Sequence, residues 1–400
     1  MKPLKLKAVY KDYIWGGEKL RTKYGKDTDM SPLAESWELS CHKDGLSTIF
    51  GGEYDGKTLE AYIKENHGCL GTLCRENQLP ILIKLIDAAD NLSVQVHPNN
   101  EQAHEWENQN GKTEMWYVVQ ADEGSKMTCG VKKDITKTEL ENAIVENKVE
   151  ELLNTVPSKK GDVFFVEAGT IHAIGKGNVI AEIQQNSNVT YRLYDYDRRD
   201  KNGNPRELHI EKGVKASNCK KTAARKIPLC SDGTRLLGSC EYFAVKEIKL
   251  SGSRTLLADE KSYHALMVTE GEAMLESADC SEKMKAGETV FIPAGLGEYS
   301  LKGEATVLLT TNQPKYFVNI ALEGTNITSE VVDEYGVVYA KASRKADSAI
   351  GCEELAECAR ESASESGLLF DDIDSVKVAS LFDNISRLEE ILSKKVYIDQ

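Results

Sequence analysis

The sequence predicts a mainly β protein with two small β-barrels, helical insertions and a small C-terminal α/β domain. Three observations lead to this fold class: a weak internal repeat of strand patterns, helical patterns between the repeats, and alternating strand and helix patterns near the C-terminus. A chain of 400 residues has room for two or three domains.

The internal repeat predicts the two barrels. Residues 161–172 read GDVFFVEAGTIH and residues 287–298 read GETVFIPAGLGE, so each has a glycine, an acid, an apolar run and then Ala-Gly. A strand-like stretch ending at an acid-glycine turn precedes each copy, at 114–124 and 263–275. Two such runs joined by a glycine turn are typical of neighbouring strands in a small barrel.

Helical patterns lie between these strands. Apolar residues recur at helical spacing in 137–155, and 58–66 also predicts a helix. The polar segment 99–110 is compatible with a helix or a loop, and the turn-rich segment 197–207 predicts a loop.

The chain changes character after Pro314, so we expect a domain boundary near 313–315. The predicted order that follows is strand, strand, helix, strand and helix, which is typical of an α/β domain. The segments concerned are Tyr316–Leu322, Ser329–Tyr339, 353–366, 373–380 and 385–394.

The formal net charge of −14 argues against non-specific nucleic-acid binding, which needs a basic surface. Most of this charge lies in residues 321–400, which hold 17 acidic and 8 basic residues. The remainder of the chain is therefore nearly neutral.

Other features of the sequence bear on the cellular compartment of the protein. No apolar run approaches the ~20 residues of a membrane span, so no membrane association is predicted. The N-terminus has no signal-peptide core, and we therefore expect a cytoplasmic protein. The ten cysteines are scattered without a CxxC pair and are expected to be small semi-buried residues.

One strand carries an unusual polar face. In LSVQVHP, strand alternation puts Ser93, Gln95 and His97 on the same side. Buried polar groups are costly unless they have partners, so this face calls for a function or for hydrogen bonds.

Two further residues have side chains of types that can bind a metal together with this face. His172 lies at the end of the repeat, and Glu114 starts a run rich in β-formers. Two imidazoles and a carboxylate form a common catalytic zinc set, to which Gln95 could add an oxygen. The same donors accept iron, manganese or cobalt, and the residues could also be separate, satisfied polar groups.

Several segments resemble the type I mannose-6-phosphate isomerases, in their short bacterial form, over roughly residues 1–313. They are YKDYIWGGEKL (10–20), AESWELS (34–40), PILIKLIDAADNLSVQVHPNN (80–100), GKTEMWYVV (111–119), GTIHAIGKG (169–177) and VTYRLYDYDR (189–198). The resemblance implies two cupin (jelly-roll) barrels: a metal-binding domain over 1–240 and a second barrel over 241–313. In the second barrel Glu298 replaces His172, so that barrel is expected to be metal-free, and His264 is expected to be a core or surface histidine.

The resemblance also implies a site and a reaction. One zinc ion would be held by His97, Glu114 and His172, often with Gln95, although another divalent metal is compatible. The reaction would interconvert mannose 6-phosphate and fructose 6-phosphate through an enediol, with the metal acting as a Lewis acid.

Arg192 matches the active-site arginine of the family. It could steady the enediolate or clamp the phosphate, and the alternative is a structural ion pair with Asp195 or Asp197. The base that removes the C2 proton is open between a metal-bound water and Asp195.

Lys112 and Ser93 are the expected substrate contacts, because Lys112 shares a strand face with Glu114 if the strand begins there, and the family places a lysine in the pocket. Lys84 and Trp15 are weaker candidates, with a surface lysine and a core or lid aromatic as the alternatives. A second function class also stays open, namely a non-catalytic cupin that binds a sugar phosphate or acts as a scaffold.

Residues 315–400 resemble the N-terminal half of a ROK-type sugar kinase. In YFVNIALEGTNITSEVVDEYGVVYAKAS (316–343), however, Ala321 replaces the aspartate of the phosphate loop and Glu323 its first glycine. A glutamate repels phosphate, so we expect a degenerate domain without kinase activity. It could pack on the isomerase part or mediate homo-oligomerisation.

Overall fold

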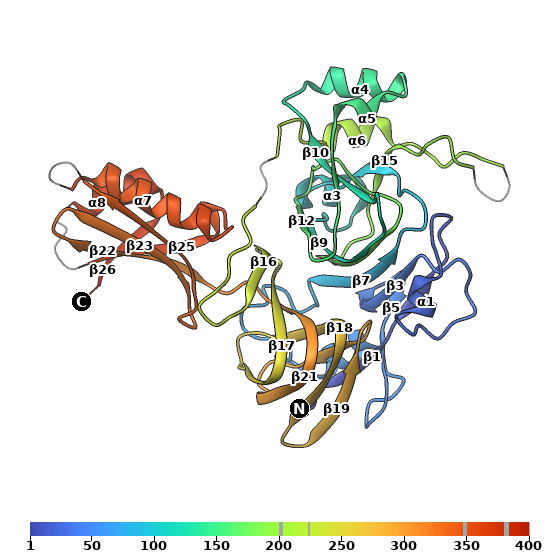
Figure 1. The fold of residues 1–400 in the computed structure, drawn as a ribbon, viewed down its shortest axis with the longest axis horizontal. Helices are drawn as coiled ribbons and strands as arrows, with labels where there is room; N and C mark the ends of the chain where they lie inside the picture. Colours follow the sequence, from blue (N-terminus) through green and yellow to red (C-terminus); the bar gives the residue numbers. More distant parts are fainter. Residues whose placement is uncertain (200–202, 223–224, 347–349, 380–383, 400) are drawn as a thin grey trace. The chain divides into compact units, whose positions relative to one another are not determined.

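The computed structural model describes residues 1–199, 203–222, 225–346, 350–379 and 384–399, and strands dominate it (Figure 1). The chain divides into two compact units. The first comprises Met1–Ala223 and Ser251–Ala305, and the second comprises Ala224–Leu250 and Thr306–Gln400. The predicted fold class is confirmed, whereas the domain limits 1–240, 241–313 and 315–400 stay a prediction.

Two sheets of the first unit wrap into a barrel, drawn from blue to green in Figure 1. The five-stranded sheet has the order β11-β10-β13-β8-β15, with β8 (Val94–Val96), β10 (Lys126–Val131), β11 (Leu153–Pro157), β13 (His172–Ile174) and β15 (Tyr191–Tyr194). The six-stranded sheet has the order β12-β9-β14-β7-β3-β2, with β2 (Val9–Lys11), β3 (Glu35–Leu39), β7 (Ile81–Asp87), β9 (Glu114–Ala121), β12 (Val163–Val166) and β14 (Asn178–Gln185).

Two strands of this barrel combine full burial with charged residues. Every residue of β7, which reads ILIKLID, is buried, and so is every residue of β14, which reads NVIAEIQQ. Aliphatic residues fill most positions, as expected for strands covered on both faces. Lys84 and Glu182 interrupt the two runs, so the interior of this barrel contains charge.

The first unit also contains strands of the second barrel. These are β1 (Leu4–Lys7), β6 (Thr48–Ile49), β18 (His264–Ser277), β19 (Cys280–Lys285) and β20 (Thr289–Ile292). Strand β1 pairs with β20, where Leu4 lies opposite Phe291, and with β6, so the N-terminus of the chain completes a sheet built mainly from much later residues. Two long strands, β17 (Phe243–Ala258) and β21 (Gly297–Thr311), have residues in both units.

His264 in this second barrel is a core residue. Its Nδ1 lies 2.7 Å from the Tyr299 hydroxyl, and both side chains are buried. This agrees with the expectation of a core or surface histidine.

The predicted helices of the first unit are present, with one correction. Helix α2 (Leu59–Glu65) matches the prediction at 58–66, and 99–110 contains α3 (Asn100–Glu107). The helical pattern predicted over 137–155 is interrupted and ends early, because α4 (Lys137–Val145) ends before Asn147, whose φ is +57°, and a strand begins at Leu153. The short α5 (Val149–Leu152) follows and leads into β11. The remaining short elements are α1 (Lys19–Thr22), β4 (Cys41–His42), β5 (Gly45–Leu46) and α6 (Ile210–Ala216).

The second unit has a five-stranded sheet of order β24-β23-β22-β25-β26, with α7 (Cys352–Glu365) packed on it. The strands are β22 (Tyr316–Glu323), β23 (Asn326–Asp333), β24 (Val338–Lys345), β25 (Ile373–Ala379) and β26 (Lys395–Asp399), with η1 (Phe370–Asp372) and α8 (Ile385–Leu392) between the later ones. Strand β25 is parallel to both β22 and β26, as the α/β prediction requires.

The expected single strand Ser329–Tyr339 was wrong in its extent. Strand β23 ends at Asp333, whose Oδ1 accepts hydrogen bonds from the backbone N–H groups of Tyr335 and Val337. A carboxylate that binds the backbone two residues ahead stabilises a turn. Gly336, with φ +80°, completes this turn, and β24 begins at Val338.

The core of the second unit extends beyond the C-terminal sheet. β16 (Arg235–Cys240) contributes Leu236 to the same buried cluster as Tyr316, and the Tyr316 hydroxyl lies 3.1 Å from Ser239 Oγ. Residues 224–250 therefore fold together with the C-terminal segment.

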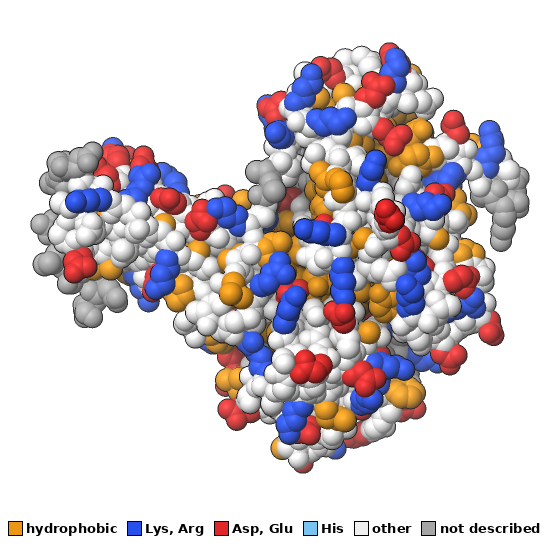
Figure 2. Space-filling model, in the orientation of Figure 1, with side chains coloured by type: hydrophobic (Ala, Val, Ile, Leu, Met, Phe, Trp, Pro, Cys, Tyr) orange, Lys and Arg blue, Asp and Glu red, His pale blue; other side chains and the backbone are white. Residues whose placement is uncertain are grey.

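Basic and acidic side chains are interspersed over the face drawn in Figure 2. Within the described residues, no helix combines the length and the apolar character needed to cross a membrane. All ten cysteines are free thiols, four of them buried.

Candidate metal centre

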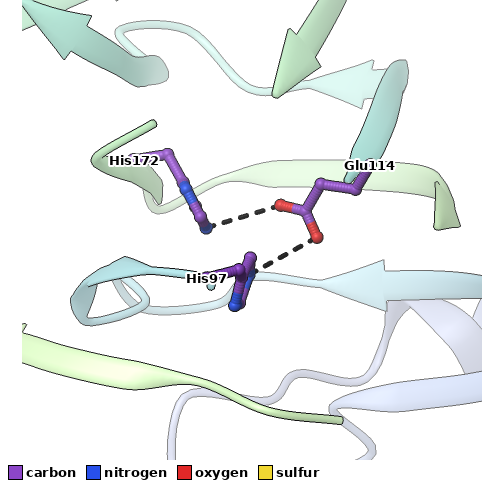
Figure 3. Close-up of side chains that lie close together, drawn as sticks. All are labelled: His97, Glu114 and His172. Carbon is purple, nitrogen blue, oxygen red and sulfur yellow. Dashed lines mark ion pairs between the residues drawn. The ribbon is translucent and has the colours of Figure 1, made fainter. Parts of the chain in front are cut away.

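His97, Glu114 and His172 converge inside the first barrel (Figure 3). Glu114 Oε2 lies 3.5 Å from His97 Nε2, and Glu114 Oε1 lies 3.4 Å from His172 Nε2. One donor atom from each residue falls within 4.8 Å of the others, and all three residues are buried. Within the described chain this is the one such group of His, Cys, Asp or Glu.

Strand pairing explains how residues so far apart in sequence meet. On the five-stranded sheet, Gln95 of β8 pairs with His172 of β13 on one side and with Arg192 of β15 on the other. Residues paired in this way point to the same face of a sheet. The predicted polar face of β8 is present, because Ser93 Oγ lies 3.4 Å from Gln95 Oε1, and Gln95 Nε2 lies 3.3 Å from His172 Nε2.

A close backbone approach brings Glu114 to His97. The backbone N–H of Lys112 donates to the carbonyl of Pro98, and Gly111 lies against Asn99 and Asn100. A Cβ at position 111 would come within 2.5 Å of the Asn100 nitrogen, so only glycine fits there. This contact places the start of β9 beside the end of β8.

Backbone carbonyls fix the tautomers of both histidines. The Nδ1 of His97 lies 2.8 Å from the carbonyl of Val189, and the Nδ1 of His172 lies 2.8 Å from that of Thr170. A carbonyl only accepts, so each Nδ1 carries the proton and each Nε2 presents a lone pair to the centre. Burial lowers the pKa of both side chains, that of His172 to about 3, which keeps them neutral and able to bind a metal.

Glu114 is a buried carboxylate without a hydrogen bond of good geometry to either oxygen. Burial raises the pKa of Glu114, although the neighbouring Lys112 ammonium, 2.7 Å from Oε2, opposes this. A divalent cation would stabilise the ionised form. Two imidazole nitrogens whose lone pairs face the centre and one carboxylate without a hydrogen bond of good geometry therefore fit a metal such as Zn²⁺.

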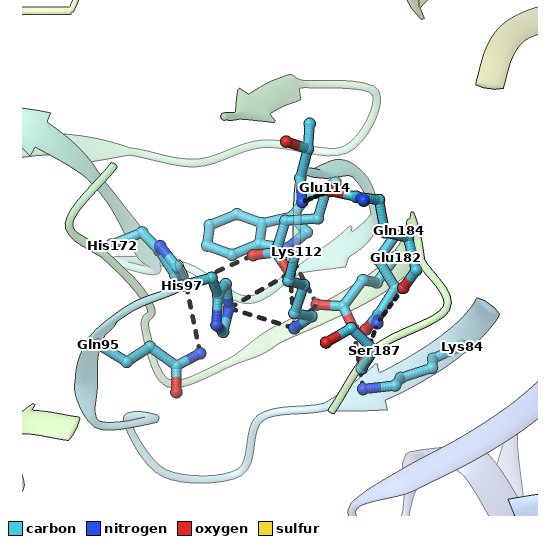
Figure 4. A network of polar contacts seen from close by, with 12 residues as sticks. Lys84, Gln95, His97, Lys112, Glu114, His172, Glu182, Gln184 and Ser187 are labelled. Atoms are coloured by element: carbon cyan, nitrogen blue, oxygen red, sulfur yellow. Dashed lines mark hydrogen bonds and ion pairs between the residues drawn. The ribbon is translucent and has the colours of Figure 1, made fainter. Parts of the chain in front are cut away.

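Lysine and glutamate side chains form a buried network next to the three residues (Figure 4). Lys112 Nζ lies 3.2 Å from His97 Nε2 and 3.9 Å from Glu182, and Lys84 Nζ lies 3.1 Å from Glu182 and 3.5 Å from Glu35. Burial opposes ionisation of Glu182, but the ammonium groups of Lys112 and Lys84 hold its pKa below the usual range.

A cavity of about 280 Å³ opens beside this network. Four predicted residues line it, namely Ser93, Gln95, Lys112 and Arg192, and the weaker candidates Lys84 and Trp15 line it as well. Lys84 is buried and is therefore not a surface lysine. The lining also includes Glu35, Glu182 and Arg206.

Arg192, which lines the cavity, has an unpaired hydrogen-bond donor. Its Nη1 donates to the carbonyl of Glu207 at 2.9 Å, while its buried Nε has no hydrogen-bond partner. The alternative ion pair with Asp195 or Asp197 is not found among the described residues. The Asp195 carboxylate is bound by Arg198 and Arg206 instead and is not part of the cavity lining.

Sequence reasoning did not single out Glu182, Glu35 or Arg206. A signal existed for Glu182, because an acid within the apolar run of β14 is as unusual as Lys84 within β7. No local pattern marks Arg206, which lies within the turn-rich segment 197–207.

Comparisons with known proteins agree with this geometry. Residues 4–133 match the family described as phosphomannose isomerase type I, catalytic domain, and residues 233–312 match that described as mannose-6-phosphate isomerase, cupin domain. The chain is 38% identical over 313 residues to mannose-6-phosphate isomerase ManA of Bacillus subtilis, covering 77% of this chain and 98% of that protein. It is 36% identical over 309 residues to mannose-6-phosphate isomerase of Streptococcus mutans, covering 76% of this chain and 97% of that one.

A solved structure extends the likeness to three dimensions. The crystal structure of the mannose 6-phosphate isomerase from Bacillus subtilis is 34% identical with a TM-score of 0.73, and the match covers 78% of this chain and 99% of that one. Both the sequence and the fold thus match over nearly the whole length of these relatives. The chain therefore belongs to the type I mannose-6-phosphate isomerase family.

Proposed function

We propose that this protein interconverts mannose 6-phosphate and fructose 6-phosphate. The observation that carries the proposal is the convergence of His97, Glu114 and His172 beside a cavity lined by cationic side chains. This arrangement offers a cation site for sugar oxygens and positive charge for a phosphate in one place.

We propose Zn²⁺ as the metal, with His97, Glu114 and His172 as its ligands. Gln95 would join them through its amide oxygen, since a 180° rotation of the amide exchanges the nitrogen now facing His172 for that oxygen. When bound, the metal supplies a Lewis acid for an oxygen of the open-chain sugar.

The side chains around the cavity would bind and orient the sugar. Lys112 and Ser93 are proposed substrate contacts, and Arg192 offers its unpaired Nε to an anionic oxygen of the enediolate or the phosphate. Glu182 holds Lys84 and stands 3.9 Å from Lys112, so it would orient both lysines. Isomerisation itself moves a proton between C2 and C1.

A coupled assay with mannose 6-phosphate on the full chain tests this function. Activity should disappear after chelation and return with Zn²⁺. His97→Ala should abolish it, whereas His67→Ala, at an exposed histidine outside the barrel interior, should not. Full activity in a metal-free sample would overturn the proposal. Binding of sugar phosphate without turnover would favour the alternative, a non-catalytic cupin.

For the C-terminal segment we propose a degenerate ROK-like half-domain with an accessory role, such as homo-oligomerisation. The strand order and the helix between parallel strands are compatible with that proposal. Glu323 pairs with Asn326, which leaves only Gly324 and Thr325 to form the turn where a phosphate loop would lie. Phosphotransfer from ATP to hexoses should be undetectable, and sedimentation of the full chain would show its oligomeric state.

A further inference from the structure

Arg192, the proposed active-site arginine, lies on the edge strand of its sheet. Among the described strands, β15 ends the order β11-β10-β13-β8-β15 and has β8 on one side. The backbone groups of an edge strand that point away from the sheet need partners from outside it. For Arg192 a single residue, His209, supplies both partners.

His209 binds the backbone of Arg192 at two points. Its N–H donates to the Arg192 carbonyl at 2.8 Å, and its ring Nδ1 accepts the Arg192 N–H at 3.1 Å. The segment before His209 adds a third contact, because Arg192 Nη1 donates to the Glu207 carbonyl at 2.9 Å. The backbone and the guanidinium of Arg192 are therefore bound by the same short segment.

The side chain of His209 serves this contact and not the helix that follows. His209 is the N-cap residue of α6, and its carbonyl accepts the N–H of Gly213, but its side chain makes no capping hydrogen bond. An N-cap side chain usually binds an N–H group of its own helix. The His209 ring instead lies against Tyr191 of β15, with 6.0 Å between the ring centroids.

Only the neutral form of His209 can make the ring contact. A backbone N–H is a donor, so Nδ1 must present its lone pair, and the ring proton lies on Nε2. Burial, and after it the Arg192 cation, lower the pKa of His209, which keeps the ring neutral near pH 7. The other ionisable groups that face the ring are Tyr191 of β15, Glu107 of α3, Glu207 and Lys212 of α6.

We propose that His209 is a positioning residue, whose neutral ring binds the backbone of Arg192 and so keeps the Arg192 side chain in the wall of the substrate cavity. Arg192 lines that cavity, whereas His209 does not. The effect of His209 on isomerisation rests on the proposed function, but its effect on Arg192 does not.

Substitutions at position 209 separate the ring acceptor from the rest of the residue. His209→Asn places an oxygen on Cγ, where Nδ1 is attached in histidine, and so keeps an acceptor. His209→Phe keeps a ring beside Tyr191 without an acceptor, and His209→Gln, with its polar group one bond further out, replaces it if the phenylalanine variant does not fold. The backbone N–H that donates to the Arg192 carbonyl is present in all of them. His104→Phe, at an exposed histidine of α3, is the control.

The first measurement is hydrogen exchange of the Arg192 amide by NMR on the full chain, which needs no enzymatic activity. The amide should be protected in the wild type, in His209→Asn and in His104→Phe. In His209→Phe it should exchange about tenfold faster, because the amide loses its hydrogen bond. Unchanged protection in His209→Phe, or an equal loss in His209→Asn, would overturn the proposal.

The second measurement is steady-state kinetics of the metal-loaded chain with mannose 6-phosphate. His209→Phe should lower kcat/KM about tenfold and His209→Asn less than about threefold, as expected for one hydrogen bond that the asparagine restores. In an Arg192→Gln background, His209→Phe should have no further effect, since His209 acts through Arg192.

A normal kcat/KM in His209→Phe, or an equal loss in the Arg192→Gln background, would overturn the positioning role. If the full chain has no isomerase activity at all, while exchange of the Arg192 amide still depends on His209, the proposed function fails and the contact between these two residues stands.

Discussion

The two barrels carry the same strand motif but differ at its functional position. In the first barrel the motif GDVFFVEAGTIH ends with His172, which is fully buried and faces Glu114. In the second barrel GETVFIPAGLGE ends with Glu298, which is exposed. The two barrels thus share a backbone pattern, and they differ chemically because different side chains stand at the end of the motif.

The interiors differ in polarity as well. Lys84, Lys112, Glu114 and Glu182 are all buried in the first barrel, whereas the second has the buried polar pair His264 and Tyr299 and one buried carboxylate, Glu247 of β17, paired with Arg235. Buried charges cost free energy unless they are paired, so the first barrel gives up stability for a functional interior.

Replacing His172 by Ala should abolish metal binding and lower kcat/KM by at least about a thousandfold, or about 4 kcal/mol, since an essential ligand is lost. Glu298→Ala, at the matching place in the second barrel, should leave both unchanged. Metal content and steady-state kinetics of the two variants check this. Equal loss of metal in both would mean that the second barrel also takes part in the site.

Replacing Lys84 by Met should lower the free energy of unfolding by about 3–5 kcal/mol, because Glu35 and Glu182 would lose a buried cationic partner. Despite burial, these carboxylates raise the pKa of Lys84, so the lysine is charged in the wild type. Lys302→Met in the second barrel removes a solvent-exposed pair with Glu276 and should cost less than about 1 kcal/mol. Denaturant unfolding of the two variants measures these losses. Equal losses in Lys84→Met and Lys302→Met would show that Lys84 does not form a buried ion pair.

Acidification should destabilise the metal-free protein through His172. Burial lowers the folded-state pKa of His172 to about 3, while the unfolded chain takes up the proton near the ordinary histidine value of 6.5. The unfolded state therefore binds more protons below pH 6.5, so stability is lost as pH falls from there towards 3. Each such proton contributes a slope of about 1.4 kcal/mol per pH unit.

His172→Gln should lose this contribution, so its stability should depend on pH less steeply than that of the wild type by up to about 1.4 kcal/mol per pH unit, while His97 keeps its own contribution. His67→Gln, at an exposed position, should retain the wild-type slope. A variant at position 172 with the wild-type pH dependence would show that His172 is not buried in its neutral form.

The comparison also shows what the sequence could predict. Strand alternation was enough to place Ser93, Gln95 and His97 on one face, because the period of two is local. The pairing of Glu182 with Lys84 depends on the register between β14 and β7, some 100 residues apart, and local patterns do not encode it. The end of α4 at Val145 was missed for a related reason, since helical spacing continues in the sequence past Asn147, which has the left-handed conformation.

The smallest expected effect concerns the polar pair of the second barrel. Tyr299→Phe removes the hydroxyl that lies 2.7 Å from His264 Nδ1 and should cost about 1–2 kcal/mol of stability, since a buried polar atom loses a partner. Metal content, KM and kcat should not change, because no residue of the pair lines the cavity. Thermal unfolding and kinetics of the same preparation check both parts. A Tyr299→Phe variant with normal stability but altered kinetics would show that the polar interior of the second barrel serves catalysis, and the contrast between the two barrels would then no longer hold.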